Sequence, residues 1–590
     1  MQAGNTRIGG IFQYGRLLEV PFYQRSYVWD TTQWSRFLED TSFLSKSKKV
    51  FFFGSIILKN APVSNTDEAY VTDKKVVIDG QQRLTTLMIF LRVLALKTNN
   101  AGAFDVMFCL PNGEPKLSHG KYDHADFNAV IKKVDIQLFP VNEHTSQIIK
   151  AFNYFSENIS PNDYDWNEIL KNSLFIEIGV QESEDEQQVF DTINSPGVSL
   201  TTAELLKNFF FKKENTAAYE KDWVAVFEPD AGVRDYWLQE IEAGRRKRVL
   251  IDVFFDAFFQ ILVDDKKYNV TAEDRIAFSR LDRLSISIKE FISKYCGGNK
   301  QVIIEQMSEY ANSFRNAIMP DAVKTNIPAD SGLERINVLI FGLSNTTIIP
   351  YILFIEKNVT SDSERAKMYG ILEAYIMRRL VCHADNKNYN RFIASLILNR
   401  VLTATALCES LQSENNATDS TMYIPNDTEL KQNFREAKLV NLQSKGILYL
   451  IETKIHPNMS AVALLGFDNY SLEHLMPKKW RNNWSGPKGE DAARRDSELL
   501  TLGNLAIIPQ SLNASIRDAS WQVKLSGKGY KAGLSACAAG LETMREVLKK
   551  TEWNETCIAE RALWLYRHAA KVWHIDGLNG SSDEENDNPG

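Results

Sequence analysis

The spacing of apolar and polar positions changes along the chain. Residues 1 to about 100 alternate short apolar runs, typical of strands, with helix patterns. From about 125 to 410 helical periodicity dominates, as in 250–261, where apolar residues recur every three or four positions. Short strand-like runs return near residues 470 and 505. The pattern therefore predicts a mixed α/β N-terminal domain, a mostly α middle and a C-terminal domain that again contains strands.

Two predicted strands in the N-terminal part precede a short polar segment. The first covers Phe51 to Leu58 and is interrupted by Gly54, and the second covers Tyr70 to Ile78. Residues 79–83, DGQQR, follow, and an amphipathic helix then begins at Leu84. We therefore expect a strand–turn–helix junction at DGQQR.

The DGQQR residues suit an anion. Gly80 permits a tight turn, and the N-terminus of the following helix offers free N–H groups and the positive end of a dipole. Arg83 adds a fork of donors, Gln81 and Gln82 add neutral ones, and Asp79 can hold Mg²⁺ or orient water. The alternative is a structural helix start in which Asp79 and Arg83 satisfy each other.

A second group of polar residues lies near the C-terminal end. Two strand-like runs, which end at Pro477 and Pro509, contain three of them, and the fourth lies where a helix can begin. The four residues are Glu473, His474, Asn504 and Asn513. Two hairpin arms followed by a helix would bring them to one point. The alternative is an ordinary surface Glu-His pair and an ordinary Gly-Asn turn.

Each of the four side chains has a task in phosphodiester hydrolysis. His474 can take a proton from water, because the pKa of histidine lies near neutrality. Glu473 and Asn513 are oxygen ligands for Mg²⁺, which would stabilise the crowded, charged phosphorus and the leaving oxygen. Asn504 is expected to accept from the second imidazole nitrogen of His474 and fix the orientation of the ring.

Charge changes this picture only locally. The whole chain carries a net charge of −7, which argues against a protein that coats nucleic acid nonspecifically. Residues 471–535 contain ten Lys and Arg against six Asp and Glu, about +4, which suits a phosphate backbone. We expect DNA contacts from Lys478, Lys479, Arg481 and Lys524.

Composition limits the class of protein. The six cysteines are scattered without a CxxC pair, which favours reduced thiols in a cytoplasmic protein and argues against a Cys₄ zinc site. No apolar run approaches the roughly 18 residues that span a bilayer. The N-terminal residues MQAGNTRIGG have no signal-peptide pattern. We expect no association with a membrane.

The chain is long enough for several domains. Residues 411–428 are small and polar and mark a boundary, and the last residues are acidic and expected to be disordered. Tryptophans near the end, including Trp553 and Trp573, are expected to clamp the small C-terminal domain. We predict domains at 1–220, 221–412 and 425–575, and an acidic tail at 576–590.

Several segments together resemble one family. They are PFYQRSYVW (21–29), GSIIL (54–58), VIDGQQRLTTL (77–87), FDTINSPGVSLTTAELLKN (190–208) and ILEAYIMRRLVCHADNKNYNRF (371–392). The first four resemble the N-terminal part of the GmrSD-type, modification-dependent (type IV) restriction endonucleases, a module similar to the ParB/sulfiredoxin nucleotide-binding fold, and the last also resembles a segment of this family. The C-terminal constellation resembles the ββα-metal (HNH, or His-Me finger) nuclease module of the same proteins. Glu473 and Asn513 depart from that pattern, which often has Asp and His there, yet both still offer an oxygen to a metal.

The resemblance implies particular sites and ligands. Asp79, Gly80, Gln81, Gln82 and Arg83 would bind an NTP (GTP or ATP), with Arg25 approaching from a neighbouring segment. Asn194, Lys207 and Asn208 are less specific, because a turn or an exposed helix end explains them at least as well. His474 and Asn504 would be catalytic, and Glu473 and Asn513 would hold Mg²⁺ or Mn²⁺.

The resulting prediction is a nucleotide-dependent DNA endonuclease, a nickase or a double-strand cutter, that acts against modified phage DNA. A homo-oligomer is one assembly state that the prediction leaves open. Three alternatives stay open. The protein is a nuclease without nucleotide control, a sensor or DNA-binding module without cutting activity, or an RNA-directed nuclease.

Overall fold

The computed structural model divides into two compact units, residues 1–216 and 217–590. It describes residues 2–21, 24, 26–63, 70–142, 145–180, 201–211, 216–244, 246–328, 332–385, 388–416, 421–457, 463–510, 518–528 and 531–576. Arg25, Asn194, Asn513 and nearly all of the predicted acidic tail lie outside these ranges. The predicted end of the first domain, at residue 220, lies close to the division between the units.

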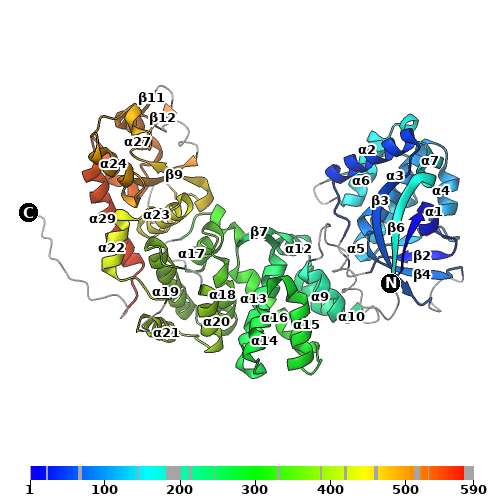
Figure 1. The fold of residues 1–590 in the computed structure, drawn as a ribbon, viewed down its shortest axis with the longest axis horizontal. Helices are drawn as coiled ribbons and strands as arrows, with labels where there is room; N and C mark the ends of the chain where they lie inside the picture. The colour runs from blue at the N-terminus through cyan, green and yellow to red at the C-terminus, as the bar shows by residue number, and fades with distance from the viewer. Residues whose placement is uncertain are drawn as a thin grey trace, which may run out of the picture. The chain divides into compact units, whose positions relative to one another are not determined.

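A six-stranded mixed sheet organises the first unit (Figure 1). In spatial order its strands are β1 (Gln2–Arg7), β6 (Ser173–Val180), β3 (Phe51–Ala61), β4 (Asp73–Asp79), β2 (Arg16–Glu19) and β5 (Leu117–Ser118). Its helices are α1 (Ile8–Ile11), α2 (Thr31–Ser47), α3 (Gln81–Lys97), α4 (Ala101–Phe108), α5 (Lys121–Ile131), α6 (Gln147–Asn158), α7 (Trp166–Asn172) and α9 (Thr202–Phe210). The predicted mixed α/β class is confirmed, and the likeness to ParB/sulfiredoxin domains stays a prediction.

Helix α3 is the centre of this unit. Period-two alternation along β3 places Ile56 and Leu58 in the large core that α3 enters, and Ile57 in a small cluster with Ile78. The sequence predicts one apolar face for α3, but residues on its other sides, such as Ile89 and Phe90, are equally buried. Helices α4, α5 and α6 all contact α3, so no face of its middle is left for solvent.

The junction between β4 and α3 depends on Gly80. Its φ of +97° lies in the left-handed region, and a Cβ atom there would come within 2.7 Å of Cγ2 of Ile56. Gly54 also has a positive φ, and the β3–β6 register shifts between Phe52 and Ser55 at this glycine. The predicted interruption at Gly54 is therefore a shift of register, because β3 itself runs without a break from Phe51 to Ala61.

We expect Gly80→Ala to lower the free energy of unfolding by about 1–3 kcal/mol, because it adds both backbone strain and a contact with Ile56. Gly102→Ala is the matched control. Gly102 lies in α4 with open space around its would-be Cβ, so this change should leave stability equal or raise it by up to about 1 kcal/mol. Chemical denaturation of both variants measures the difference. Equal stability of the two would contradict the proposed constraint.

The second unit is mainly helical (Figure 1). Its helices are α10 (Thr216–Tyr219, at the division), α11 (Ala225–Phe227), α12 (Ala231–Leu238), α13 (Leu250–Asp264), α14 (Ala272–Phe278), α15 (Leu284–Tyr295), α16 (Gln301–Ala317), α17 (Leu333–Asn337), α18 (Ile349–Asn358), α19 (Asp362–Val381), α20 (Tyr389–Leu398), α21 (Ala404–Asn416), α22 (Asp427–Glu436), α23 (Asn441–Ile455), α24 (Glu490–Glu498), α26 (Trp521–Ser526), α27 (Leu534–Cys537), α28 (Glu542–Arg545) and α29 (Glu555–Val572). Three strand pairs accompany them: β7 (Glu240–Ala243) with β8 (Arg246–Val249), β9 (Tyr470–His474) with β10 (Leu505–Pro509), and β11 (Gly527–Lys528) with β12 (Lys531–Ala532). The helix predicted over 250–261 is confirmed, and its apolar stripe is buried.

Buried arginines join the helical middle to the C-terminal part. Arg335 pairs with both carboxylate oxygens of Glu373 and also donates 3.0 Å to the carbonyl of Leu450. Arg378 donates 2.7 Å to the carbonyl of Trp573, and the indole N–H of Trp573 donates 2.9 Å to Glu373. The boundary predicted near 411–428 therefore lies inside one compact unit, because these contacts tie residues on both sides of it together.

Candidate functional site

The C-terminal candidate site is built on a short hairpin. Strands β9 and β10 pair antiparallel, with Leu505 opposite His474 and Ala506 opposite Glu473. Residues 505–508 are all buried, because β10 lies between β9 and the helices around it, including α23. Strands form in both predicted runs, but the second begins only at Leu505, so Asn504 lies in the 3-10 turn η11 (Leu502–Asn504) just before β10 and not inside the strand.

Glu473 forms a buried ion pair with Lys524 of α26. The lysine Nζ donates to Oε1 of Glu473, and it also donates 2.7 Å to the carbonyl oxygen of His474. Burial raises the pKa of Glu473 and the lysine opposes that rise, whereas burial lowers the pKa of Lys524. The prediction that Lys524 contacts DNA is wrong, because its ammonium is enclosed and already has two acceptors.

One oxygen of Glu473 is left over. Oε2 has no hydrogen-bond partner among the described residues, whereas Oε1 is held by Lys524. A carboxylate oxygen is a hard ligand and fits Mg²⁺ or Mn²⁺ by its chemistry. Asn513, the other predicted ligand, lies outside the described residues. Within the described ranges, no group of three or more His, Cys, Asp and Glu side chains is close enough to hold a metal by itself.

His474 is half-buried and uncharged at neutral pH. Burial is the largest cause that lowers the pKa of His474, and the positive charges of Lys478 and Lys524 lower it further, to about 4. No described residue forms a hydrogen bond with the imidazole, so a ring nitrogen is available to accept a proton. Neutral imidazole is the form that a general base requires.

Asn504 does not contact the imidazole. Its amide nitrogen donates 2.8 Å to the carbonyl of Met476 and 3.0 Å to that of Leu499, and its oxygen accepts from Met476 N at 2.8 Å and Trp553 Nε1 at 3.0 Å. Both N–H donors and both lone pairs are therefore used. The prediction that Asn504 orients the ring directly is wrong. It fixes the chain two residues beyond His474, and the predicted clamp by Trp553 is confirmed.

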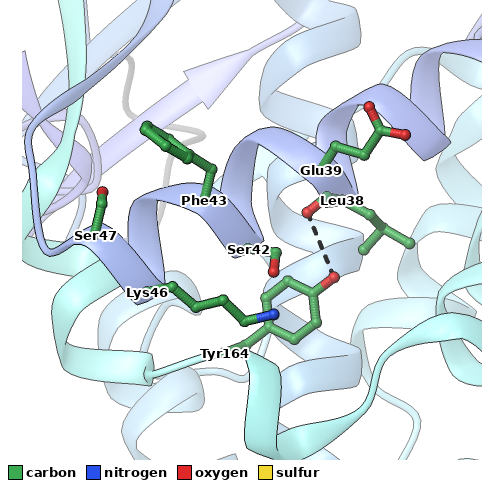
Figure 2. A pocket seen from close by; sticks show the side chains of 7 residues that line it. All are labelled: Leu38, Glu39, Ser42, Phe43, Lys46, Ser47 and Tyr164. Atoms are coloured by element: carbon green, nitrogen blue, oxygen red, sulfur yellow. Dashed lines mark hydrogen bonds between the residues drawn. The ribbon is translucent and has the colours of Figure 1, made fainter.

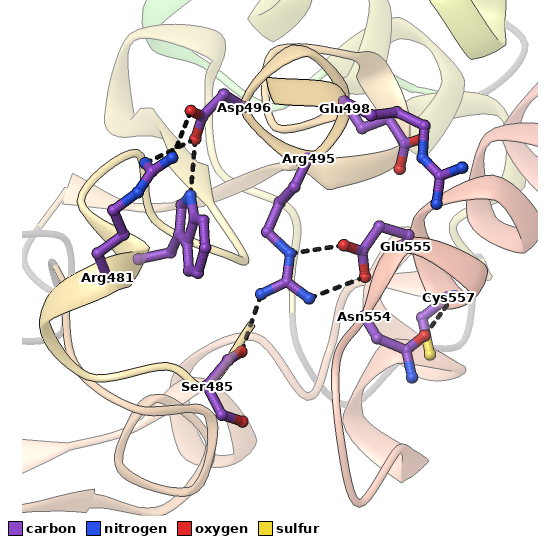
Figure 3. A network of polar contacts seen from close by, with 10 residues as sticks. Arg481, Ser485, Arg495, Asp496, Glu498, Asn554, Glu555 and Cys557 are labelled. Carbon is purple, nitrogen blue, oxygen red and sulfur yellow. Dashed lines mark hydrogen bonds and ion pairs between the residues drawn. The ribbon is translucent and has the colours of Figure 1, made fainter. Parts of the chain in front are cut away.

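The segment between β9 and β10 is held by a polar network (Figure 3). Asp496 of α24 accepts from the indole N–H of Trp480 at 2.7 Å and from both terminal nitrogens of Arg481 at 3.0 and 2.8 Å. Arg495 pairs with both carboxylate oxygens of Glu555, at the start of α29. These contacts position the segment that follows the Glu-His pair.

The remaining predicted DNA contacts lie on the surface. Lys478 and Lys479 are exposed and have no ion pair with any described residue. The side chain of Arg481 is also exposed, but both of its terminal nitrogens donate hydrogen bonds to Asp496. All three therefore lie where a phosphate backbone can reach them, close in sequence to His474, and their role stays a prediction.

The N-terminal candidate site lies where β4 passes into α3. Gly80 is the N-cap of α3, and because it has no side chain, no side chain caps the first N–H groups of the helix. Arg83 donates through Nη1 to the carbonyl of Ser55, and the same nitrogen lies 3.5 Å from Oδ2 of Asp79. The structural alternative, in which Asp79 and Arg83 pair with each other, is thus observed in part, because one nitrogen of Arg83 reaches one oxygen of Asp79. The Nε and Nη2 of Arg83 have no partner among the described residues.

Gln82 has a structural partner in the preceding loop. Its side-chain oxygen accepts from Val28 N at 2.9 Å, and its nitrogen lies 3.3 Å from the carbonyl of Ser26. Gln81 is buried. Of the predicted nucleotide ligands, Asp79 and Arg83 therefore keep side-chain atoms without a partner among the described residues, and Gly80 leaves the first N–H groups of α3 without a side-chain cap. Arg25 lies outside the described residues, and the side chain of Asn208 is likewise not described.

A buried polar network beside α3 was not predicted. Asp123 accepts from Tyr27 N at 2.7 Å, and burial raises the pKa of Asp123 to about 6. His119 lies 3.8 Å from Asp123 and bonds Thr85 of α3 at 3.1 Å, and burial lowers the pKa of His119 to about 3. The one sequence feature that could have indicated this network is the spacing of four residues between His119 and Asp123. Asp123 of α5 holds the loop before α2, and the hydroxyl of Tyr27 in this loop also bonds Thr86 of α3 at 2.6 Å.

A surface depression on α2 is separate from this junction (Figure 2). It has a volume of about 690 Å³ and lies between α2 and Tyr164. Two of its polar groups have partners: Tyr164 donates 3.4 Å to the carbonyl of Leu38, and Lys46 pairs with Asp163 at 2.8 Å. None of the predicted nucleotide ligands lines it, so we assign no function to it.

Comparison with protein families finds two matches. Residues 8–211 match the N-terminal domain of the GmrSD restriction endonucleases, and residues 424–567 match their C-terminal domain. The DGQQR junction lies in the first match and the Glu473–His474 hairpin in the second. Residues 212–423 lie between the two matches. A comparison with curated proteins found no matching relative.

Proposed function

Because the chain belongs to the GmrSD restriction endonuclease family and contains both of its domains, we propose that it is a DNA endonuclease whose C-terminal hairpin hydrolyses phosphodiester bonds with a divalent cation. The family supports a restriction nuclease with DNA as its substrate. One observation carries the mechanism. A neutral imidazole and a carboxylate oxygen, neither with a hydrogen-bond partner among the described residues, belong to adjacent residues at the end of β9.

The residues have distinct tasks in this proposal. His474 accepts a proton from the attacking water, and Asn504 holds the backbone just beyond it in place. Oε2 of Glu473 and the side chain of Asn513 would hold Mg²⁺ or Mn²⁺. When bound, such an ion supplies positive charge for the transition state and the leaving oxygen. Lys524 holds Oε1 and thereby keeps Oε2 in a fixed orientation.

The N-terminal domain is proposed to bind and hydrolyse ATP or GTP and so to control cutting. The first turn of α3 has no side-chain cap, so its N–H groups suit a phosphate. The Nε and Nη2 of Arg83 have no hydrogen-bond partner among the described residues, and Asp79 lies beside this guanidinium. Arg25, Gln81 and Gln82 complete the proposed set. Gln82 would contribute mainly by holding the loop at Ser26 and Val28.

Arg83→Ala tests the nucleotide site. We expect it to lower the rate of NTP hydrolysis by at least about tenfold, because a charge-assisted contact with phosphate is lost. Arg36→Ala is the control, since Arg36 is exposed on α2 with one weak pair to Asp40 at 4.0 Å, and its turnover should equal that of the wild type. The measurement is phosphate release from ATP and from GTP. Equal background rates for wild type and Arg83→Ala would favour a nuclease without nucleotide control.

Plasmid nicking tests the nuclease function itself. The wild type should nick DNA in the presence of Mg²⁺ and stop when the ion is chelated. Methylated, glycosylated, phosphorothioated and plain DNA, each with and without ATP or GTP, test the proposed preference for modified foreign DNA. Labelled RNA in competition tests the RNA alternative. Absence of nicking on every substrate would favour a sensor or binding module.

A further inference from the structure

A cavity in the second unit lies in the part of the chain that neither family match covers. It has a volume of about 610 Å³ and is formed by the β7–β8 turn, α13, α14, the 3-10 turn η8 (Thr346–Ile348), α18 and α20. This volume falls within the range of roughly 300–1,000 Å³ that is typical of small-molecule sites. The cavity therefore has room for a ligand with one or two rings.

Helix α13 presents a row of acceptors to this cavity. Asp256, Gln260 and Asp264 follow each other at intervals of four, so they lie on one face of an otherwise apolar, buried helix. Arg248 holds Asp256 at 3.1 Å, and Arg275 holds Asp264. Burial raises the pKa of both carboxyl groups, to about 6 for Asp264. Half-buried ion pairs add little net stability, so packing alone does not explain this row.

Several polar groups on the cavity wall have no hydrogen-bond partner among the described residues. Oε1 of Gln260 and Oδ2 of Asp264 have no partner among the described residues, because Gln260 donates only its nitrogen to Asp256 and Arg275 holds the other oxygen of Asp264. Asn390 and Arg391 of α20 likewise have no hydrogen bond or ion pair within the described ranges. The cavity thus offers free acceptors from one helix and a free cation from another.

Apolar side chains complete the lining. Ile276 and Leu281 lie at the cavity and are 74% and 54% exposed, although both are large aliphatic residues. Phe259 and Phe278 also line the cavity and are themselves buried. Exposed aliphatic side chains beside free polar groups suit a ligand with a flat, apolar face and polar edges.

We infer that this cavity binds one nucleotide. The amino and imino edge of the base would donate to Gln260 and Asp264, which are residue types that read the exocyclic amines of adenine and cytosine. The ring face would lie against Ile276 and Leu281, and the phosphate would pair with Arg391. The nucleotide is either a free mononucleotide or a base turned out of duplex DNA. Only the second source rests on the proposed nuclease function.

Binding to the full chain tests the inference. Calorimetric titration with dAMP and dCMP examines the free source. Fluorescence of 2-aminopurine at a single mismatch in a duplex examines the DNA source, because a mismatched base costs least to turn out and brightens when unstacked. The variant is Arg391→Ala, which removes an exposed side chain and should fold. Arg234→Ala, an exposed arginine of α12 outside the cavity, is the charge-matched control.

We expect Arg391→Ala to weaken binding of at least one of these probes by tenfold or more, and Arg234→Ala to leave it unchanged. An effect on the mononucleotides assigns the free source, and an effect on the fluorescent duplex alone assigns the everted base. If neither probe binds in a manner that depends on Arg391, the inference is overturned. The readout is binding without cleavage. If the protein nicks DNA but fails this test, only the proposed nucleotide cavity is overturned. If it binds mononucleotides at this cavity but never nicks DNA, only the proposed nuclease function is overturned.

Discussion

Replacing His474 with alanine is expected to lower the rate of Mg²⁺-dependent DNA nicking by about 10²–10⁴-fold, the usual contribution of a general base. The expectation follows from the environment of the ring. His474 is neutral at pH 7, and its imidazole has no hydrogen bond to any described residue. Initial rates of conversion of supercoiled to nicked plasmid, measured with enzyme in excess, give the size of the effect.

The fold should survive this substitution. Because the ring makes no described hydrogen bond and is half-buried, the melting temperature of His474→Ala should stay within a few degrees of the wild type. His574→Ala is the matched control, since the side chain of His574 is exposed and its Nε2 lies 3.1 Å from Oδ1 of the exposed Asp576. A folded His474→Ala protein that nicks as fast as His574→Ala would remove His474 from the mechanism.

The pH dependence of nicking offers a second readout of the same residue. The folded-state pKa of His474, about 4, lies below the ordinary value of 6.5, so the neutral base persists well into the acid range. We expect kcat/KM, which reports the free enzyme, to change little between pH 7 and about pH 5.5. The same shift means that the contribution of His474 to stability is complete above pH 6.5 and is lost as the pH falls towards 4. An acid limb of kcat/KM centred near 6.5 would contradict the proposed environment.

Replacing Lys524 with methionine is expected to lower the free energy of unfolding by about 3–5 kcal/mol, because Glu473 would be left as a buried carboxylate without its cation. The backbone at His474 would also lose the hydrogen bond that its carbonyl accepts from Lys524 at 2.7 Å. Urea denaturation followed by tryptophan fluorescence measures the loss. Lys528→Met, an exposed lysine four residues further on, should change stability by less than about 0.5 kcal/mol.

A double variant separates the ion pair from simple loss of packing. Lys524→Met combined with Glu473→Gln removes both charges, so its stability should recover part of the loss seen in Lys524→Met. If the single and double variants are equally unstable, the unpaired carboxylate is not the cause. If Lys524→Met is as stable as Lys528→Met, the ion pair does not organise the site.

Local sequence was sufficient to predict many of the helices and strands and the segments of the chain that contain the two candidate sites. The strands beside Glu473 and Asn504, the register shift in β3 at Gly54 and the helix over 250–261 follow from period-two and period-3.6 patterns and from glycine, which act over a few residues. The segments that resemble the GmrSD family were also readable as short motifs, and both family matches confirm the architecture. A pattern of this kind depends only on neighbours along the chain.

Only the tertiary structure decided which side chains meet. The sequence suggested that Lys524 is a surface cation, but the packing of α26 places it in a buried ion pair with Glu473 of β9, more than fifty positions away in sequence. Asn504 looked free to hold the imidazole, but Trp553 and the Met476 backbone use all of its hydrogen-bonding capacity. Arg335, Arg378 and Trp573 join parts of the chain that a polar segment had seemed to separate. Burial and partner choice are set by elements distant in sequence that pack together, and local composition contains no record of that packing.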